Sequence, residues 1–499
     1  MIARLPIKRI GQVMLILSAC GGALLLARPA ADRTQKDPTH AMDHWEDPYD
    51  CVGCHYERYA DWSSSQMSRA YTGDFFQAQY FQYAVKDSAR DPKMEGLAAD
   101  CLGCHSPSAF LSGVVPPPKV EEPDNFWDRA WPWLDSYRTI GQVQTGLQYG
   151  PLRENLVRAG TNPLAEAKQD ADRGVFCDFC HSLSGIAQRD PVNHNYRVDA
   201  GPGRNTKRAD LEFPWSPYHK TQVSELFETA ELCGICHNEQ NTFGVFVKAT
   251  HREWLDTPYA SRDIVCQFCH MPPREGKPAK MGRERPWNHA HWFGGGFTGF
   301  VEGAARVKLG LDATTVAAGS VVPLEVSISD IATGHLFPTG ATEERDVWLR
   351  VAVCDAEGRE LQHIPVPPNP QDPNDRYFIT SSRAEAYPSH SAASQAISRD
   401  ALPEGDRIYH DVFLDSADKV TFGQWYAVRI VGNRLVPGET RVEKYAWQVP
   451  PDLAGRQVHL KATLWYRRMA DSHAEILDIE KRPHLLVSED ARRIQIMGP

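Results

Sequence analysis

The chain has 499 residues, of which 42% are hydrophobic and 24% are charged, and its formal net charge is −10. This length predicts two domains plus a targeting segment, and the composition is that of a soluble globular protein. The negative charge argues against nucleic acid as a partner, because binding to phosphates requires a basic patch.

Residues 1–30 are predicted to be an export signal and not part of the fold. Lys8 and Arg9 supply a positive flank, and an apolar run follows from Ile10 to Ala27. A run of this length is at the lower edge of what spans a bilayer as a helix. We therefore expect the rest of the chain to lie outside the cytoplasm, on the periplasmic or cell-surface side of a bacterial membrane and attached to it.

Three forms of this N-terminus are consistent with the sequence. Leu17-Ser18-Ala19-Cys20 resembles the lipobox of bacterial lipoproteins, in which Cys20 would become the acylated first residue. Apolar residues follow Cys20, where lipoproteins usually turn polar, so an uncleaved signal anchor with Cys20 as a small apolar residue is the alternative. A mature protein released from the membrane is the third form.

Ten of the twelve cysteines fall into five Cys-x-x-Cys pairs, and each pair is followed at once by His. This is the attachment motif of c-type haem: the cysteines bond to the vinyl groups as thioethers, and the histidine becomes the proximal iron ligand. A zinc interpretation fails, because zinc needs further ligands and no histidine directly after every second cysteine. The sequence predicts five covalently bound haems. The motifs are Cys51-Val-Gly-Cys54-His55, Cys101-Leu-Gly-Cys104-His105, Cys177-Asp-Phe-Cys180-His181, Cys233-Gly-Ile-Cys236-His237 and Cys266-Gln-Phe-Cys269-His270.

The sixth iron ligand separates electron transfer from chemistry, since an iron with two strong axial ligands is closed to substrate. Nineteen histidines less the five proximal ones leave fourteen candidates. His335, His219 and one of His289 and His291 are the first choices. His219 lies just upstream of the fourth motif, His289 and His291 lie just after the fifth, and His335 lies in a loop between predicted strands. The further distal candidates are Met67, His194 and His44. Histidines expected to be ordinary residues of the C-terminal part include His363, His390, His410, His459, His473 and His484.

The fold class expected is multidomain. Residues 31–300 are predicted to form a pentahaem cytochrome domain, mostly α-helical and irregular, in which porphyrins supply the missing apolar core. Residues 114–133 contain three consecutive prolines and predict an exposed connector. The interval before the third motif leaves room for a helix around residues 165–174.

Residues 301–499 change to the alternating pattern of strands. Turn residues at 355–358 and 436–439 separate them. We expect an all-β domain, an antiparallel sandwich of immunoglobulin-like type, with Cys354 as a core thiol. The strands predicted most clearly are 305–311, 321–328, 347–353 and 457–466.

The surroundings of the motifs resemble the cytochrome c554-like family of multihaem cytochromes. The likeness spans residues 50–480 and implies haems packed in parallel and perpendicular pairs. Gly-His-Leu-Phe-Pro-Thr-Gly at residues 334–340 resembles a loop of the C-terminal β domain of some members, which implies that His335 is a distal ligand and that this domain docks on the haem domain. The segments that carry the resemblance are 62–70, 174–181, 231–237, Glu253-Trp254, 266–272 and 334–340.

Two features depart from known patterns. Family members often have His where Met67 stands, so the resemblance implies one haem with His/Met ligation or without a sixth protein ligand. Pentahaem nitrite reductases have a similar size, but they use Lys as the proximal ligand at the catalytic haem. No Cys-x-x-Cys-Lys occurs in this sequence.

The sequence favours an electron carrier that passes electrons between redox partner proteins through closely packed haems. Haem propionates add negative charge, so a basic redox partner is expected. The alternative is a multihaem oxidoreductase that reduces or oxidises a small nitrogen or sulfur compound at one five-coordinate haem. A filament-forming cytochrome is a third interpretation.

Overall fold

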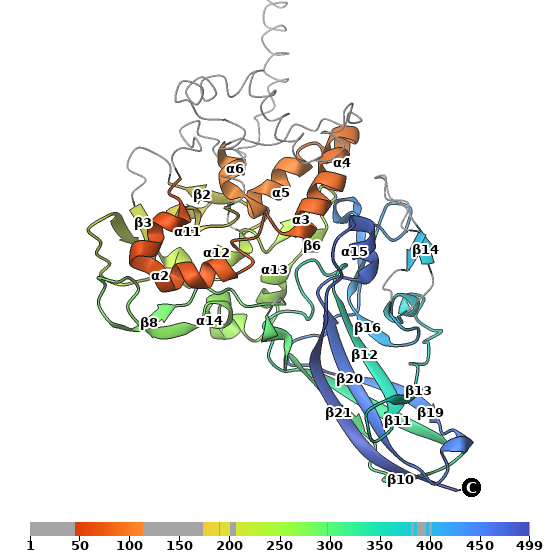
Figure 1. Ribbon diagram of the computed structural model, residues 1–499. Coiled ribbons are helices and arrows are strands. Elements are labelled where there is room, and N and C mark those ends of the chain that lie inside the picture. The colour runs from red at the N-terminus through yellow and green to blue at the C-terminus, as the bar shows by residue number, and fades with distance from the viewer. Residues whose placement is uncertain are drawn as a thin grey trace, which may run out of the picture.

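The computed structural model describes residues 45–112, 173–188, 190–199, 206–296, 298–380, 384–386, 396–398 and 402–498. Figure 1 shows two parts, which we call the motif region (residues 45–300) and the β region (residues 301–498). The predicted export signal, His44, the connector at 114–133 and most of the helix around 165–174 lie outside the described residues. None of the described helices has the length and hydropathy of a membrane-spanning segment.

The motif region consists of short helices and small two-stranded sheets. Helices were expected, whereas the paired strands β1–β2, β3–β4, β5–β6 and β7–β8 were missed because each is only two to five residues long. The helices are α2 (Pro48–Ser64), α3 (Asp74–Gln79), α4 (Val85–Arg90), α5 (Leu97–His105), α6 (Pro107–Ser112), α11 (Cys177–Ser182), α12 (Glu231–Gly234), α13 (Thr250–Leu255) and α14 (Cys266–His270), with the π-helical turn η2 (Tyr80–Ala84). The strands are β1 (Leu183–Ile186), β2 (Tyr196–Val198), β3 (Thr206–Ala209), β4 (Lys220–Val223), β5 (Glu239–Gln240), β6 (Phe246–Lys248), β7 (Pro273–Gly276) and β8 (Arg285–His289).

Four of the five Cys-x-x-Cys-His motifs lie wholly within a helix, and the fourth begins in α12. One helical turn brings residues three and four apart onto the same face, which is the spacing that two thioethers to one haem require. In α2, Asp47 accepts a hydrogen bond from the Tyr49 amide and Pro48 occupies the first turn, as at many helix starts. The backbone of His55 is not helical, so the helix kinks at the end of the motif.

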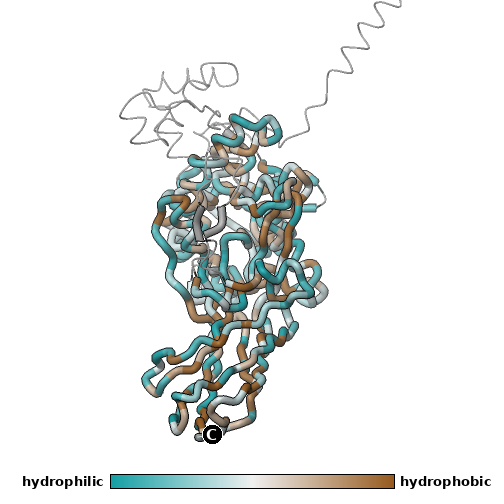
Figure 2. The backbone as a smooth tube through the Cα atoms, turned by 90° about the vertical axis from the view of Figure 1, so that its right-hand side faces the viewer, coloured by the Kyte–Doolittle hydropathy of each residue, from teal (hydrophilic) through white to brown (hydrophobic). Residues whose placement is uncertain are grey.

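The β region contains two main sheets. One has the strand order β10-β21-β20-β12-β13, with β16 also paired to β12, and the other has the order β19-β11-β9. Figure 2 shows hydrophobic and hydrophilic residues alternating along these strands, and β9 alternates strictly between buried and exposed positions. Strand bounds are β9 (Ala305–Gly310), β10 (Thr315–Ala317), β11 (Val321–Asp330), β12 (Asp346–Cys354), β13 (Glu360–His363), β16 (Arg407–Tyr409), β19 (Thr440–Gln448), β20 (Gln457–Arg467) and β21 (His484–Met497).

The expected β-rich C-terminal part is present, and all four strands predicted most clearly occur. Cys354 is buried at the end of β12, as expected of a core thiol. The structure departs from an antiparallel, purely β arrangement: β10 runs parallel to β21, and a helix, α15 (Asp471–Leu477), follows β20. An immunoglobulin-like type is therefore not confirmed. The remaining short pairs are β14 (Ala384–Ala386) with β15 (Ala396–Ser398), and β17 (Asp411–Leu414) with β18 (Arg429–Gly432).

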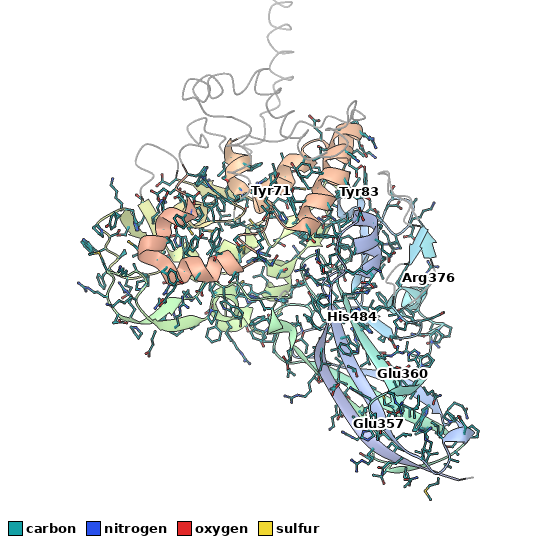
Figure 3. The ribbon with its side chains drawn as sticks, in the orientation of Figure 1. Tyr71, Tyr83, Glu357, Glu360, Arg376 and His484 are labelled. Carbon is teal, nitrogen blue, oxygen red and sulfur yellow. The ribbon has the colours of Figure 1, made fainter. Side chains whose placement is uncertain are left out.

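The two regions share a hydrophobic core at their junction. Phe422, Trp425 and Leu477 of the β region are buried in one cluster with residues of α3 to α5. The Trp425 indole donates to Asp87 Oδ2 (2.9 Å), and α15 lies beside the orange helices of the motif region (Figure 1). Figure 3 shows Tyr83 next to α15. The Tyr83 hydroxyl donates a hydrogen bond to the carbonyl of Ile476 in this helix (3.5 Å). The two regions therefore pack as one unit.

We expect Phe422→Ala to lower the free energy of unfolding by about 3–5 kcal/mol, because it empties a fully buried aromatic site. Denaturant unfolding followed by circular dichroism and by haem absorbance should show both transitions moving together. Val442→Ala, at a position that is 47% exposed, serves as the control and should change stability by no more than about 0.5 kcal/mol. A haem transition that stays in place would show that the junction does not couple the regions.

Candidate haem centres

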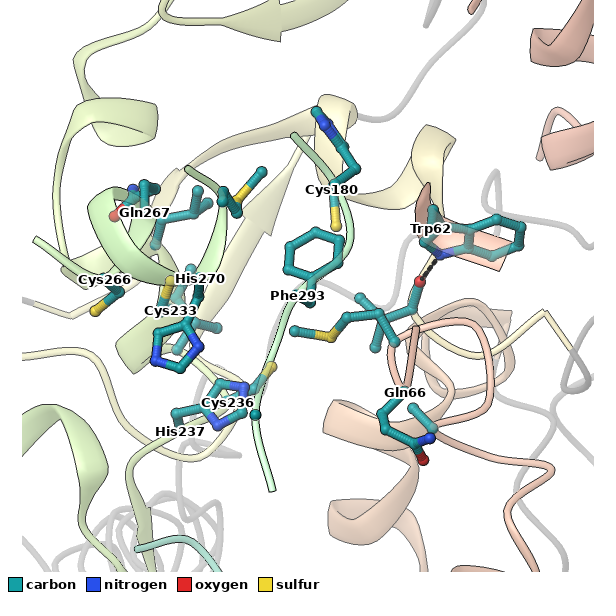
Figure 4. A pocket seen from close by; sticks show the side chains of 18 of the residues that line it. Trp62, Gln66, Cys180, Cys233, Cys236, His237, Cys266, Gln267, His270 and Phe293 are labelled. Carbon is teal, nitrogen blue, oxygen red and sulfur yellow. Dashed lines mark hydrogen bonds between the residues drawn. The ribbon is translucent and has the colours of Figure 1, made fainter. Parts of the chain in front are cut away.

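One continuous cavity of about 1830 Å³ connects all five motifs. Every motif cysteine and every motif histidine lines it. In the close-up of Figure 4, Cys180, Cys233, Cys236 and His237 surround a common space with Phe293 at its centre. The cavity extends through the motif region, and residues of the β region, among them His335 and Arg345, also line it.

Contacts between cysteines show which motifs are neighbours. The side chains of Cys51 and Cys177, of Cys104 and Cys236, and of Cys233 and Cys266 lie next to each other. An electrostatic interaction of Cys180 with Cys233 adds a link between the third and fourth motifs. The first motif is therefore next to the third, the third to the fourth, and the fourth to both the second and the fifth.

Four motif histidines are oriented by a hydrogen bond from ring Nδ1 to a backbone carbonyl. A carbonyl can only accept, so Nδ1 carries the proton and Nε2 keeps its lone pair for a metal. This arrangement is common among metal-bound histidines. The bonds run from His55 to Pro278 (2.9 Å), from His105 to Ala70 (2.7 Å), from His181 to Arg208 (2.6 Å) and from His270 to Gly294 (2.5 Å).

Three motif histidines face a second histidine ring across the cavity. A metal–nitrogen bond is about 2 Å long and the ring centre lies roughly 1.1 Å further back, so two imidazoles on one iron have centres about 6.3 Å apart. The observed separations fall at this value, and the rings are nearly parallel. The pairs are His55 with His219 (6.4 Å, 25°), His181 with His291 (6.1 Å, 24°) and His270 with His335 (6.3 Å, 18°).

Two of the three opposing rings, His291 and His335, are in the protonation state that a metal requires. Burial lowers the pKa of His291 to about 3 and that of His335 to about 4. Burial also lowers the pKa of the proximal His105 and His237 to about 4. These imidazoles are neutral at neutral pH, and a neutral ring has a free nitrogen lone pair to donate.

The other distal candidates occupy different positions. His289 has both ring nitrogens engaged, with Nδ1 donating to Met271 O (2.6 Å) and Nε2 at 3.2 Å from Asp210 Oδ2, so His291 is the one of this pair that faces a motif histidine. His194 packs against Gly103 of the second motif with Nε2 at 3.4 Å from Asp100, and it faces no motif histidine. Met67 lines the cavity.

Within the described part of the chain, no histidine ring lies opposite His105 or His237. The ring of Phe76 stacks on His105 at 4.0 Å, which is too close for a metal between them. The electrostatic partners of the two histidines are motif histidines, His237 for His105 and His270 for His237, together with charged side chains that the sequence analysis missed. The charged side chains are Lys248, Glu239 and Arg345.

These charged side chains form a compact group at the junction. Lys248 lies opposite Glu239 in the β5–β6 pair, and its Nζ is 2.5 Å from Glu239 Oε2. Glu239 follows His237 by two residues. Glu344 accepts a hydrogen bond from Gln79 (3.1 Å), and burial raises the pKa of Glu343 to about 7. The only sequence signal for this group was the run Glu343-Glu344-Arg345 just after the Gly-His-x-x-Pro-Thr-Gly loop, and hydrophobic patterning assigns it no role.

The residues present fit covalently bound haem. Paired cysteines on helical turns, oriented neutral imidazoles and a large shared cavity are the requirements of c-type attachment. No other group that binds through Cys-x-x-Cys-His explains the opposed rings at this spacing.

Comparisons with known proteins agree with this chemistry. A family model described as "Cytochrome c554 and c-prime" matches residues 50–117. No curated protein sequence matches the chain. The structure of a penta-heme cytochrome c552 from Thermochromatium tepidum is similar, with a TM-score of 0.55 and 18% identity, covering 91% of this chain and 100% of that one. Spo0M from Bacillus subtilis gives a TM-score of only 0.14 at 12% identity, covering 39% of this chain and 50% of that one.

The fold is thus that of a multihaem c-type cytochrome with a C-terminal β region. The predicted resemblance to the cytochrome c554-like family is confirmed, and it implies covalently bound haem and a redox role.

We expect His219→Ala, His291→Ala and His335→Ala each to convert one haem from low-spin to high-spin, because each removes one of two opposed rings. Electron paramagnetic resonance (EPR) of the oxidised protein measures the conversion. His289→Ala is the matched control and should leave every spin state unchanged, because Asp210 and Met271 engage its ring. The assignment would be contradicted if the control gained a high-spin signal that the wild-type protein lacks, or if the three variants gained none.

Proposed function

We propose that the protein is a pentahaem c-type cytochrome that carries electrons between redox partners through closely packed haems. The observation that carries this proposal is the single cavity lined by all five motifs. Haems held in one cavity lie close together, and the iron supplies one-electron redox chemistry without a reacting side chain.

The contacts between cysteines support a branched route. Electrons entering at the first motif would pass to the third and then to the fourth, from which the second and fifth motifs both branch. The chain's own residues set the potentials: opposed histidines hold three irons with two strong ligands, and burial lowers the local dielectric.

The surroundings of the protein are part of the proposal. The export signal at residues 1–30 favours a place outside the cytoplasm and attachment to the membrane, either as a lipoprotein or through a signal anchor. The formal charge of −10, with haem propionates added, favours a basic redox partner. The immunoglobulin-like type of the β region stays a prediction.

A multihaem oxidoreductase is the second candidate, favoured by the surroundings of His237. No histidine of the described chain faces this ring, and its electrostatic partners are His270 of the fifth motif and the cationic Arg345 and Lys248. The nearby Glu343 carboxyl holds a proton part of the time at neutral pH, since burial raises its pKa to about 7. Reduction of a small nitrogen or sulfur compound consumes both protons and electrons, which such a place supplies.

The intact mass of the exported protein should equal the polypeptide plus five haems, because each motif has both cysteines at the cavity wall. A Cys266→Ser/Cys269→Ser variant should carry four. Five haems in this double variant, or fewer than five in the parent protein, would contradict the proposal.

EPR of the oxidised protein separates the carrier from the enzyme. The carrier predicts low-spin haems whose spectrum is unchanged by nitrite, hydroxylamine or cyanide. A high-spin signal that shifts to low-spin on addition of these compounds would favour the oxidoreductase, and it should weaken in Arg345→Gln but not in Arg359→Gln, an exposed control.

A further inference from the structure

The loop that carries His335 is part of the β region, yet its histidine faces the fifth motif. It connects β11 to β12, and the Thr333 hydroxyl donates to the His335 carbonyl (2.7 Å). Two backbone hydrogen bonds of 2.9 Å join Phe337 and Leu435. These bonds fix the loop within the β region, but they do not place it against the motif region.

A buried ion pair between the regions does so. Glu253 of α13 accepts from Arg434 Nη1 at Oε1 (2.6 Å) and from the Thr339 hydroxyl at Oε2 (2.7 Å). The same Arg434 nitrogen donates to the carbonyl of Pro338 (3.1 Å), and Arg434 Nε lies 2.9 Å from Asp411 Oδ2. Arg434 is therefore hydrogen-bonded to residue 338 and Glu253 to residue 339, which lie three and four positions after His335.

The pair is shielded from water, which makes its loss costly. The side chains of Glu253 and Arg434 are 6% and 11% exposed. Removing Arg434 leaves the Glu253 carboxylate buried without its cationic partner, whereas removing Glu253 leaves Arg434 paired with Asp411 alone. Either change removes a hydrogen bond that holds the loop against the motif region, from Arg434 to Pro338 or from Thr339 to Glu253.

Helix α13 also anchors the segment that leads to His270, the motif histidine that faces His335. The indole of Trp254, next to Glu253, donates to the carbonyl of Ile264 (2.9 Å), two residues before Cys266 of the fifth motif. Thr250 of the same helix is hydrogen-bonded to Thr339 (2.8 Å). One short helix thus anchors both the segment that leads to His270 and the loop that carries His335.

We propose that Glu253 and Arg434 are positioning residues that hold His335 opposite His270, so that the docking of the β region determines the ligation of the fifth-motif haem. This inference rests on the proposed haem ligation and adds how the chain enforces it. Neither residue touches the iron; both act through the loop at residues 334–340.

Glu253→Ala tests the inference in the haem-loaded full chain. We expect one of the low-spin haems to become high-spin, while the mass still shows all covalent haems. Glu253→Gln should retain the low-spin state in most molecules, because a carboxamide can still accept from Arg434 and bond to Thr339. Arg434→Lys should behave like Glu253→Ala, because lysine cannot span Glu253, Pro338 and Asp411 at once.

A double variant tests whether the effect of Glu253→Ala on the haem spin state acts through His335. The double variant Glu253→Ala/His335→Ala should show one more high-spin haem than the wild-type protein, as His335→Ala alone does, since both changes remove the same ligand. Two additional high-spin haems in the double variant would overturn the inference.

The control is Glu443 of β19, whose carboxylate pairs with Arg407 at 3.2 Å and is 13% exposed. Glu443→Ala removes a similarly buried ion pair whose hydrogen bonds go to Arg407 and Tyr409 and not to residues 334–340, and it should leave all spin states as in the wild-type protein. A high-spin signal in this control that the wild-type protein lacks would reduce the effect to general destabilisation and overturn the inference.

Two failures can be told apart. An unchanged spectrum in His335→Ala would remove the ligand assignment itself. A changed spectrum in His335→Ala together with unchanged spectra in Glu253→Ala and Arg434→Lys would leave the ligand assignment and overturn only the positioning role.

Discussion

Two imidazoles that share an iron must be neutral, nearly parallel and about 6.3 Å apart at their ring centres. Three pairs of histidines meet the two geometric conditions across the cavity. The rest of the architecture follows from holding them there. Helical turns present the motif histidines, backbone carbonyls fix their tautomer, and burial keeps the partner rings of His291 and His335 unprotonated. A cavity of this size inside a chain with few aliphatic residues in its motif region is stable only when apolar groups fill it.

The β region is part of this arrangement and not an appended module. Its loop supplies His335, its residues Phe422 and Trp425 complete the core under α3 to α5, and its Arg434 forms a buried pair with Glu253. The group around Lys248, Glu343 and Arg345 lies at the same junction, next to the two motif histidines that no described histidine faces. The junction between the regions thus brings together His335, the buried Glu253–Arg434 pair and this charged group.

Sequence alone predicted the parts of this account that depend on local spacing. The five motifs, the four main strands, the histidines at 219 and 335 and the choice of one of His289 and His291 rest on short patterns that need no tertiary information. His289 and His291 could not be separated, because the choice depends on Asp210, which is 79 positions before His289. The buried group at Lys248 and the hydrogen bonds of Arg434 and Glu253 to residues 338 and 339 were missed for the same reason. Both join side chains that are distant in the chain, and neither leaves a periodic signal. The parallel pairing of β10 with β21 likewise depends on strands about 180 residues apart.

The central claim is that three irons are held by opposed histidine pairs, one of them completed by the β region. Near-infrared magnetic circular dichroism of the oxidised wild-type protein reports the axial ligand pair of each low-spin haem. The account predicts bands of bis-histidine ligation with the intensity of three haems, and different ligation at the second and fourth motifs. Bis-histidine intensity for fewer than three haems would contradict it.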